Sequence, residues 1–195
     1  MIVGLVLAAG ESTRMGQDKA LLLYRGRTFL ETIVSTMHEG GIERVAVVLG
    51  HHSEEIRRAV VLRGAEIVVN PHYQLGQTNS LKEGLAALDR PEVEGVLFCL
   101  VDHPAVSAET IRAMSEAFRP PLPSAIIPTF RGQRGHPVLI SRKLIHELLS
   151  LSAGVGANTV IRKHLASARL LEVNDAGVVT DIDDAEAYHR LDEPA

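Results

Sequence analysis

Residues 1–19 read MIVGLVLAAGESTRMGQDK, an apolar run followed directly by a loop rich in small residues. The run Ile2 to Leu7 is short, rich in β-branched residues and without clean alternation, as is typical of a strand buried on both faces of a sheet. Similar runs recur at Arg44 to Leu49, Glu66 to Val69, Val96 to Val101 and Ala125 to Pro128. The opening stretch is therefore the first in a series of predicted buried strands.

Helical patterns separate these strands. They lie at about Thr28 to Glu39, Ser53 to Leu62, Asn79 to Leu88 and Ser107 to Phe118, and the second and fourth open with a Ser that can cap the helix. Alternating strands and helices predict a Rossmann-like, doubly wound and mostly parallel α/β sheet with helices on both faces. In such a sheet the ligand crevice lies beyond the carboxyl ends of the strands, so we expect the functional residues there.

The rhythm changes after Pro128. A Gly- and Arg-rich loop is followed by a predicted strand at Val138 to Ile140, helices near Arg142 to Leu151 and Ala157 to His164, and strands near Leu170 to Val173 and Val178 to Ile182. Because no repeat, low-complexity tract or linker separates this part, we expect residues 1–195 to form one domain. Residues of about 1–128 and 129–195 would then form the two sides of one crevice.

The composition is that of an ordinary globular domain, with 46% apolar residues in 195. The net charge of −4 provides no basic field for nucleic acid. The single cysteine, Cys99, cannot form an internal disulfide and lies in an apolar run, which favours a packed thiol. The opening run has no basic segment before it and is too short to span a bilayer, so we expect a cytoplasmic protein with no nucleic-acid or membrane partner.

The loop after the first strand has the composition of a phosphate-binding loop. Gly10 and Gly16 permit unusual dihedral angles, while Arg14 and Lys19 bring two cations to backbone N–H donors, which suits a triphosphate. The spacing matches neither a Walker A motif nor the Rossmann dinucleotide fingerprint. By spacing alone, a solvated turn remains an alternative.

This loop resembles the signature Leu-Ala-Ala-Gly-x-Ser-x-Arg-Met-Gly-x-x-Lys of the MobA-like nucleotidyltransferases, and within that family the molybdenum cofactor cytidylyltransferase branch. Every fixed position matches. The resemblance implies a fold of the nucleotide-diphospho-sugar transferase type. It also implies transfer of a nucleoside monophosphate from an NTP to a small phosphorylated acceptor, with release of pyrophosphate and with Mg²⁺, or alternatively Mn²⁺, as cofactor. Residues 1–128 would be the NTP-binding part and 129–195 the acceptor side.

The resemblance assigns nucleotide contacts along the signature. The backbone around Ala8 to Gly10 would face the nucleotide, Arg14 would contact the β and γ phosphates, and Lys19 would neutralise the α-phosphate, which makes both cations predicted catalytic residues. The full predicted set is Leu7, Ala8, Ala9, Gly10, Ser12, Arg14, Gly16 and Lys19.

A carboxylate follows the fourth predicted strand, in Val101-Asp102-His103-Pro104. A carboxylate at the carboxyl end of a central strand lies at the ligand crevice, and Mg²⁺ prefers carboxylate and phosphate oxygens. Asp102 is therefore the first predicted metal ligand and a predicted catalytic residue, with a turn before Pro104 as the structural alternative. Relatives usually read Asp-Gln-Pro, so His103 departs from the pattern, and it is either a bystander or functional.

A second acidic motif, Asp181-Ile182-Asp183-Asp184, resembles the family's Asp-Ile-Asp-Thr-Pro-Glu-Asp. In a strand, Asp181 and Asp183 would point to the same side, so either could reach a metal with Asp102. We favour Asp183 as the second metal ligand, because that position matches the metal-binding Asp of related sugar-nucleotide synthetases. The alternative is that Asp183 or Asp184 caps the following helix.

Two further motifs resemble the base and acceptor sites of the family. A Gly-x-x-x-Ser loop, here Gly76, Gln77, Asn79 and Ser80, would hold the base and ribose, although Asn79 or Ser80 could also cap a helix. A Gly-His-Pro motif, here with Arg134, Gly135 and His136, would bind the acceptor phosphate. The family's later Gly-Asp-x-Gly-Ala-Arg is replaced by residues 154–158, GVGAN, which lack the Asp and the Arg.

The Ala-Ala-Gly form of the signature favours CTP as the NTP and molybdopterin as the acceptor. A molybdoenzyme or its maturation factor would then receive the product. Three alternatives remain: guanylyl transfer to molybdopterin, nucleotidyl transfer to a sugar or alcohol phosphate, and, from another class, a non-catalytic nucleotide sensor or molybdenum cofactor chaperone. The other histidines show no zinc-like spacing.

Overall fold

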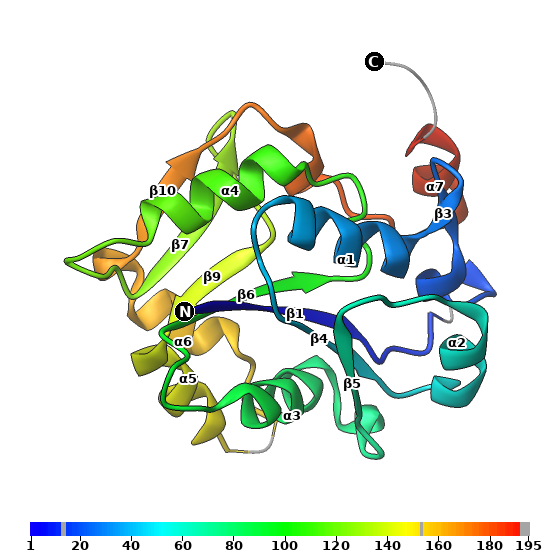
Figure 1. Ribbon diagram of the computed structural model, residues 1–195, viewed down its shortest axis with the longest axis horizontal. Coiled ribbons are helices and arrows are strands. Elements are labelled where there is room, and N and C mark those ends of the chain that lie inside the picture. Colours follow the sequence, from blue (N-terminus) through cyan, green and yellow to red (C-terminus); the bar gives the residue numbers. More distant parts are fainter. Residues whose placement is uncertain (13–14, 153, 192–195) are drawn as a thin grey trace.

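The computed structural model describes residues 1–12, 15–152 and 154–191 and is built on one sheet with the strand order β10-β7-β9-β6-β1-β4-β5 (Figure 1). The strands are β1 (Ile2–Ala8), β4 (Val45–Leu49), β5 (Ala65–Val69), β6 (Gly95–Leu100), β7 (Ala125–Phe130), β9 (Val138–Ser141) and β10 (Arg169–Glu172), and β8 (Gln133–Arg134) pairs with β7 beside this path. Along the path only β9 runs antiparallel to its neighbours. The prediction of a mostly parallel α/β sheet is confirmed.

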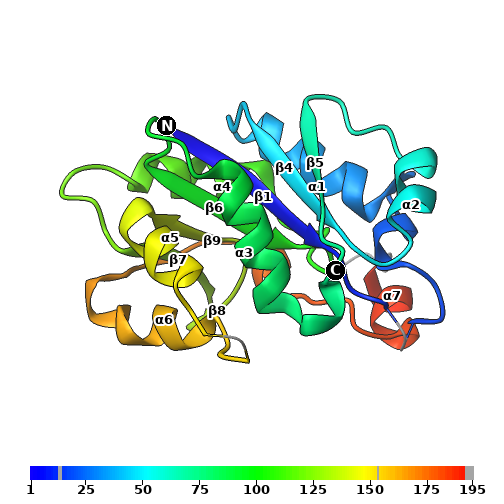
Figure 2. The same cartoon turned by 90° about the horizontal axis from the view of Figure 1, so that it is seen from below.

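Helices cover both faces of the sheet (Figures 1 and 2). On one face lie α1 (Phe29–Glu39) and α4 (Ala108–Ala117), and on the other lie α3 (Gln77–Leu88), α5 (Arg142–Leu149) and α6 (Asn158–Lys163). Val6 packs with α1 and α4, whereas Leu5 and Leu7 pack with α3 and α5. Successive side chains of β1 thus enter opposite hydrophobic layers, which explains why this strand shows no polar alternation.

Helix ends follow local capping chemistry. Thr28 and Glu31 form a reciprocal capping box at the start of α1, and Ser107 accepts a hydrogen bond from the backbone of Thr110 as the predicted cap of α4. The prediction for Ser53 was wrong, because α2 (Ser53–Ala59) already begins at that residue and His52 occupies the cap position in a left-handed conformation. In the part of the chain that is described, no helix has the length and apolarity needed to cross a bilayer.

The third predicted helix also begins earlier than expected. The helix α3 starts at Gln77, so Asn79 and Ser80 lie within its first turn and neither caps it. The remaining short elements are η2 (Lys19–Leu21), β2 (Leu23–Tyr24), β3 (Arg27–Thr28), η3 (Tyr73–Leu75), η4 (Leu165–Ser167) and η5 (Ala176–Val179). The pair β2 and β3 forms a small hairpin that follows the signature loop.

The predicted strand at Val178 to Ile182 was wrong. The chain there forms the 3₁₀ turn η5, because the Asp175 carboxylate accepts hydrogen bonds from the backbone N–H groups of Ser107 and Gly177. Among the described residues, the segment after η5 makes one backbone–backbone hydrogen bond to another part of the chain, from the Ile182 N–H to the Asp102 carbonyl (2.9 Å). The C-terminal segment therefore crosses the loop after β6 and does not join the sheet.

We predict that Gly177→Ala destabilises the protein by about 1–3 kcal/mol, because a Cβ there would overlap the backbone carbonyl of Ala105. Gly156→Ala is the matched control, since open space surrounds the equivalent Cβ position, and it should change stability by less than about 0.5 kcal/mol. Urea unfolding of both variants measures the difference. Equal stabilities would show that Gly177 does not fix the C-terminal segment.

Candidate functional site

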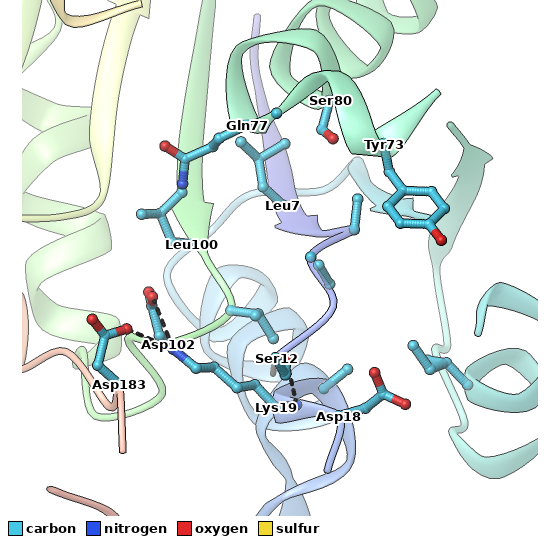
Figure 3. Close-up of a pocket in the computed structure, with 17 residues that line it drawn as sticks. Leu7, Ser12, Asp18, Lys19, Tyr73, Gln77, Ser80, Leu100, Asp102 and Asp183 are labelled. Carbon is cyan, nitrogen blue, oxygen red and sulfur yellow. Dashed lines mark hydrogen bonds and ion pairs between the residues drawn. The ribbon is translucent and has the colours of Figure 1, made fainter. Parts of the chain in front are cut away.

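A cavity of about 320 Å³ lies where β1 and β6 end, at the predicted crevice (Figure 3). Most of the predicted nucleotide and metal residues line it, namely Leu7, Ala8, Ala9, Gly10, Ser12, Lys19, Gly76, Gln77, Ser80, Asp102 and Asp183. The structure thus brings together residues from the beginning, middle and end of the chain.

Of the other predicted nucleotide-binding residues, Arg14 lies outside the described residues. Gly16 and Asn79 do not line the cavity. Gly16 is an exposed turn residue with a φ of +68°. The Asn79 side chain accepts a hydrogen bond (2.9 Å) from the buried Asn70, which also donates to Ser80 Oγ (3.0 Å). Asn70 therefore orients the first turn of α3.

Lys19 lies between two carboxylates that line the cavity. Its Nζ is 2.7 Å from Asp183 Oδ1 and 3.6 Å from Asp102 Oδ2, and Figure 3 shows both contacts. Its backbone N–H donates to Ser12 Oγ (3.1 Å), which fixes the residue within the signature loop. Asp102 and Asp183 thus converge on the position of one cation.

The structure separates the three neighbouring aspartates of the C-terminal motif. Asp183 faces the cavity, whereas Asp181 is exposed and is not among the lining residues. Asp184 accepts a hydrogen bond from the Ala187 N–H (2.8 Å) at the start of α7 (Ala185–Leu191). The helix-capping role thus falls to Asp184, and the side chain that meets Lys19 is that of Asp183.

The donor set fits a hard divalent cation. Two carboxylates face one position, and the buried Oδ1 of Asp102 has no hydrogen-bond partner among the described residues. Within the same residues, no group of three or more His, Cys, Asp or Glu side chains could hold a metal alone. Mg²⁺ commonly binds to one or two carboxylates and completes its shell with water and substrate phosphates, so the pair suffices.

A second cavity of about 390 Å³ adjoins the first, since Leu7, Gln77 and Leu100 line both. It contains the three predicted acceptor residues Arg134, Gly135 and His136. Its other lining residues combine polar groups with apolar walls: Thr78, Leu81, Phe98, Ile127, Val138, Gly156, Ala157, Asn158, Ile161 and Arg162. The two cavities thus meet beside the ends of β1 and β6.

Residues 4–169 match the family model of the MobA-like NTP transferase domain. The chain belongs to this family. It is 32% identical to nicotine blue oxidoreductase of Paenarthrobacter nicotinovorans, over 97% of this chain and 96% of that protein. It is 24% identical to the molybdenum cofactor cytidylyltransferase of Escherichia coli (strain K12), over 92% of this chain and 89% of that protein. The resemblance to the family is thereby confirmed, whereas the predicted branch is not established.

The solved structure of Rv0371c from Mycobacterium tuberculosis H37Rv has the same fold, with a TM-score of 0.86 and 31% identity over 97% of this chain and 96% of that chain. Its complex with manganese gives a TM-score of 0.82 and 30% identity, over 97% of each chain. The fold is of the nucleotide-diphospho-sugar transferase type, as predicted. A divalent cation is thus found with a relative of this MobA-like protein.

His136 of this MobA-like protein is held by its backbone against the C-terminal segment. Its N–H donates to the Val178 carbonyl (2.8 Å), and a Cβ on the neighbouring Gly135 would overlap that carbonyl oxygen. Burial, and secondarily the nearby His103, lowers the pKa of the His136 imidazole to about 4. The ring is therefore neutral near pH 7, so it can hydrogen-bond to an acceptor but leaves charge neutralisation to Arg134 and Arg162.

The sequence did not predict one rim of the first cavity. Tyr73 and Asp18 line the cavity, and His51 and His52 connect them. His51 Nδ1 is 3.1 Å from the Tyr73 hydroxyl, His52 Nδ1 is 2.9 Å from Asp18 Oδ2, and the two imidazole centroids are 3.7 Å apart. The hydrogen bond to Asp18 raises the pKa of His52. Because these side chains meet only through the fold, their spacing in the sequence gave no signal.

We predict that His136 makes the protein less stable in acid. Its pKa is about 4 in the folded state against an ordinary 6.5, so between these values the unfolded chain binds more protons. Stability should fall as the pH drops from about 6.5 towards 4, by up to roughly 1.4 kcal/mol per pH unit. Unfolding free energies at about pH 7 and pH 5 should differ less in His136→Phe than in the wild type.

The exposed His146 on α5 provides the control. His146→Phe should retain the acid sensitivity of the wild type. If His136→Phe showed the same dependence on pH as the wild type, the imidazole of His136 would not be neutral in the folded protein.

Proposed function

We propose that this MobA-like protein transfers a nucleoside monophosphate from an NTP, preferably CTP, to a phosphorylated acceptor of the molybdopterin type, releasing pyrophosphate. One observation carries the proposal: two cavities meet at Leu7, Gln77 and Leu100, and a Lys19-Asp102-Asp183 cluster lies in the first of them. An NTP in the first cavity would expose its α-phosphorus to an acceptor phosphate in the second.

The chemistry requires positioning and charge neutralisation. An oxygen of the acceptor phosphate forms a new bond to the α-phosphorus, and the bond to the β-phosphate oxygen breaks, so pyrophosphate leaves with the electron pair. Asp102 and Asp183 would hold the Mg²⁺ or Mn²⁺, which supplies positive charge to the phosphates when bound. Lys19 would then release the carboxylates and neutralise the α-phosphate. Arg14 keeps its predicted role at the β and γ phosphates.

The choice of CTP rests on the Ala-Ala-Gly signature and on the likeness to a relative named as a cytidylyltransferase. The backbone of Ala8 to Gly10 would face the base, and Gln77 and Ser80 offer it an amide and a hydroxyl. Guanylyl transfer to molybdopterin and transfer to a sugar or alcohol phosphate are the alternatives within the class. If CTP and molybdopterin are the substrates, a molybdoenzyme or its maturation factor would receive the product.

The acceptor cavity supports an acceptor that has both a ring system and a phosphate. Phe98, Ile127 and Val138 provide apolar walls, while Arg134 and Arg162 provide guanidinium groups. We propose that residues of about 1–128 form the NTP part and residues of about 129–195 the acceptor side. Some residues of each part also line the cavity of the other part. Asp183 lines the first cavity, and Gln77, Thr78, Leu81 and Phe98 line the second.

Two other functional classes compete with this proposal. A non-catalytic nucleotide sensor or a cofactor chaperone would use the same cavities without turnover. The name of one relative, nicotine blue oxidoreductase, indicates a different class of reaction, an oxidation–reduction. The first loop lacks the glycine spacing of a dinucleotide fingerprint, and the paired carboxylates suit phosphate transfer, so we favour the transferase.

Pyrophosphate release tests the proposal. The protein is incubated with Mg²⁺ or Mn²⁺, each NTP and candidate acceptors, and we expect the fastest release with CTP and a molybdopterin. Asp102→Asn should lower kcat by roughly 100-fold or more, because it removes a carboxylate at the reacting phosphates. Asp181→Asn, at an exposed position, should retain activity within about twofold. No release with any pair would reject the transferase and leave the sensor or chaperone.

We further predict that Arg162→Ala raises the KM for the active acceptor by about 10- to 100-fold while leaving the KM for the NTP unchanged. Arg162 lines only the second of the two cavities, and a charge-assisted hydrogen bond contributes about 1.5–3 kcal/mol. Arg57→Ala, on α2 away from both cavities, is the control. An increase in the KM for the NTP would instead place Arg162 at the nucleotide.

A further inference from the structure

The buried His103 and the partly buried His136 lie side by side, and His136 lines the acceptor cavity. His103 follows Asp102 in the loop after β6 and is 6% exposed, and His136 belongs to the acceptor motif. Their ring centroids are 5.0 Å apart at an interplanar angle of 39°. The Asp102 loop and the acceptor loop are therefore in direct contact through these two rings.

His103 also faces the Asp102 carboxylate. Its Nε2 is 3.7 Å from Asp102 Oδ1, which is too long for a direct hydrogen bond but close enough for a polar contact. Asp102 divides its contacts between its two oxygens, because Oδ2 faces Lys19 and Oδ1 faces the imidazole. An N–H at Nε2 would place a partial positive charge near Oδ1 and would favour this orientation of the carboxylate.

The surroundings restrict the His103 ring. Ile33, Met37 and Cys99 border a small gap of about 10 Å³ next to it, and His136 covers another side. Nδ1 of His103, Nδ1 of His136 and Oδ1 of Asp102 are all buried without a hydrogen-bond partner among the described residues. Burying such atoms unpaired costs about 1–3 kcal/mol each, so their retention in one cluster calls for a functional reason.

We propose that His103 is a positioning residue that orients Asp102 for the divalent cation and couples it to the acceptor loop through His136. This inference rests on the proposed function, since it requires the metal site at Asp102 and Asp183. An acceptor that contacts His136 fixes the ring on which His103 packs, and His103 in turn fixes the carboxylate. Occupation of the acceptor cavity thereby favours the carboxylate orientation needed for transfer.

The affinity for Mn²⁺ tests the first part of the inference. Free Mn²⁺ is measured by electron paramagnetic resonance with the protein and CTP, in the absence of acceptor. His103→Phe keeps a ring against His136 but removes the N–H, so Mn²⁺ should bind about tenfold more weakly, as when an indirect partner of a metal ligand is lost. His103→Gln restores an N–H donor to Asp102 and should bind Mn²⁺ within about twofold of the wild type.

Two further variants distinguish a failure of the metal site from a failure of the role proposed for His103. His146→Phe makes the same change at an exposed histidine and should leave Mn²⁺ affinity unchanged. Asp102→Asn should weaken Mn²⁺ binding more than any His103 variant. If Asp102→Asn has no effect, the proposed metal site itself fails. If Asp102→Asn weakens binding but His103→Phe does not, the metal site stands and the positioning role is rejected.

A double-mutant cycle tests the coupling to the acceptor loop. His136→Ala removes the ring beneath His103 and should weaken Mn²⁺ binding about threefold in the wild-type background, less than the direct loss of the His103 N–H. The same change should have no effect in the His103→Gln background, where the ring pair is already absent. Equal effects in both backgrounds would overturn the coupling. This cycle stands even if His103→Phe does not fold.

Discussion

The pairing of β1 with β6 places the signature loop next to the loop that carries Asp102. The two strands are parallel, with Leu7 opposite Leu100, so both strands end at the same edge of the sheet. The signature loop continues from β1, and the Asp102 loop continues from β6. The approach of Lys19 to Asp102 follows from this register, and a slip of one residue would place Leu7 and Leu100 on opposite faces of the sheet.

The sequence predicted the central sheet well because the signal there is local. Strands buried on both faces need runs of β-branched and aliphatic residues, and β1, β4 and β6 lie within or close to those runs. Helix α4 was also predicted, because Ser107 is a local cap. The strand predicted at Val178 to Ile182 was wrong because the contacts that decide its structure are distant in the sequence. Ile182 packs with Leu22, Tyr24 and Phe29, and Asp175 bonds to the start of α4, which no local pattern reveals.

The residues of the candidate site also divide into those that local motifs predicted and those that they did not. The signature, Asp102 and Asp183 were found because each lies in a motif contiguous in the sequence, and the structure brings them to one cavity. Arg162 and Tyr73 were missed because a helix surface and a short 3₁₀ turn have no motif of their own. Asn79 was assigned to the nucleotide, but its side chain binds Asn70. A motif identifies a loop, whereas the direction of each side chain depends on contacts distant in the sequence.

Hydrogen-bond satisfaction distinguishes structural polar groups from those available for chemistry. Asn70 is fully buried, yet its side chain bonds to Asn79, Ser80 and the backbone of His72, and it fixes a helix start. Asp175 likewise satisfies its carboxylate with three donors on α4 and η5.

The cluster of Asp102, His103 and His136 differs, because Asp102 Oδ1 and the ring Nδ1 atoms of His103 and His136 lack partners among the described residues. Single unpaired atoms also occur at Thr32 and His38, but there they stand alone. The carboxylate of Asp175 has its hydrogen bonds satisfied, whereas Asp102 Oδ1 keeps a lone pair that is free to bind a ligand. Since burying an unpaired polar atom is unfavourable, this arrangement is the one expected of a carboxylate that binds a cation under the proposed function.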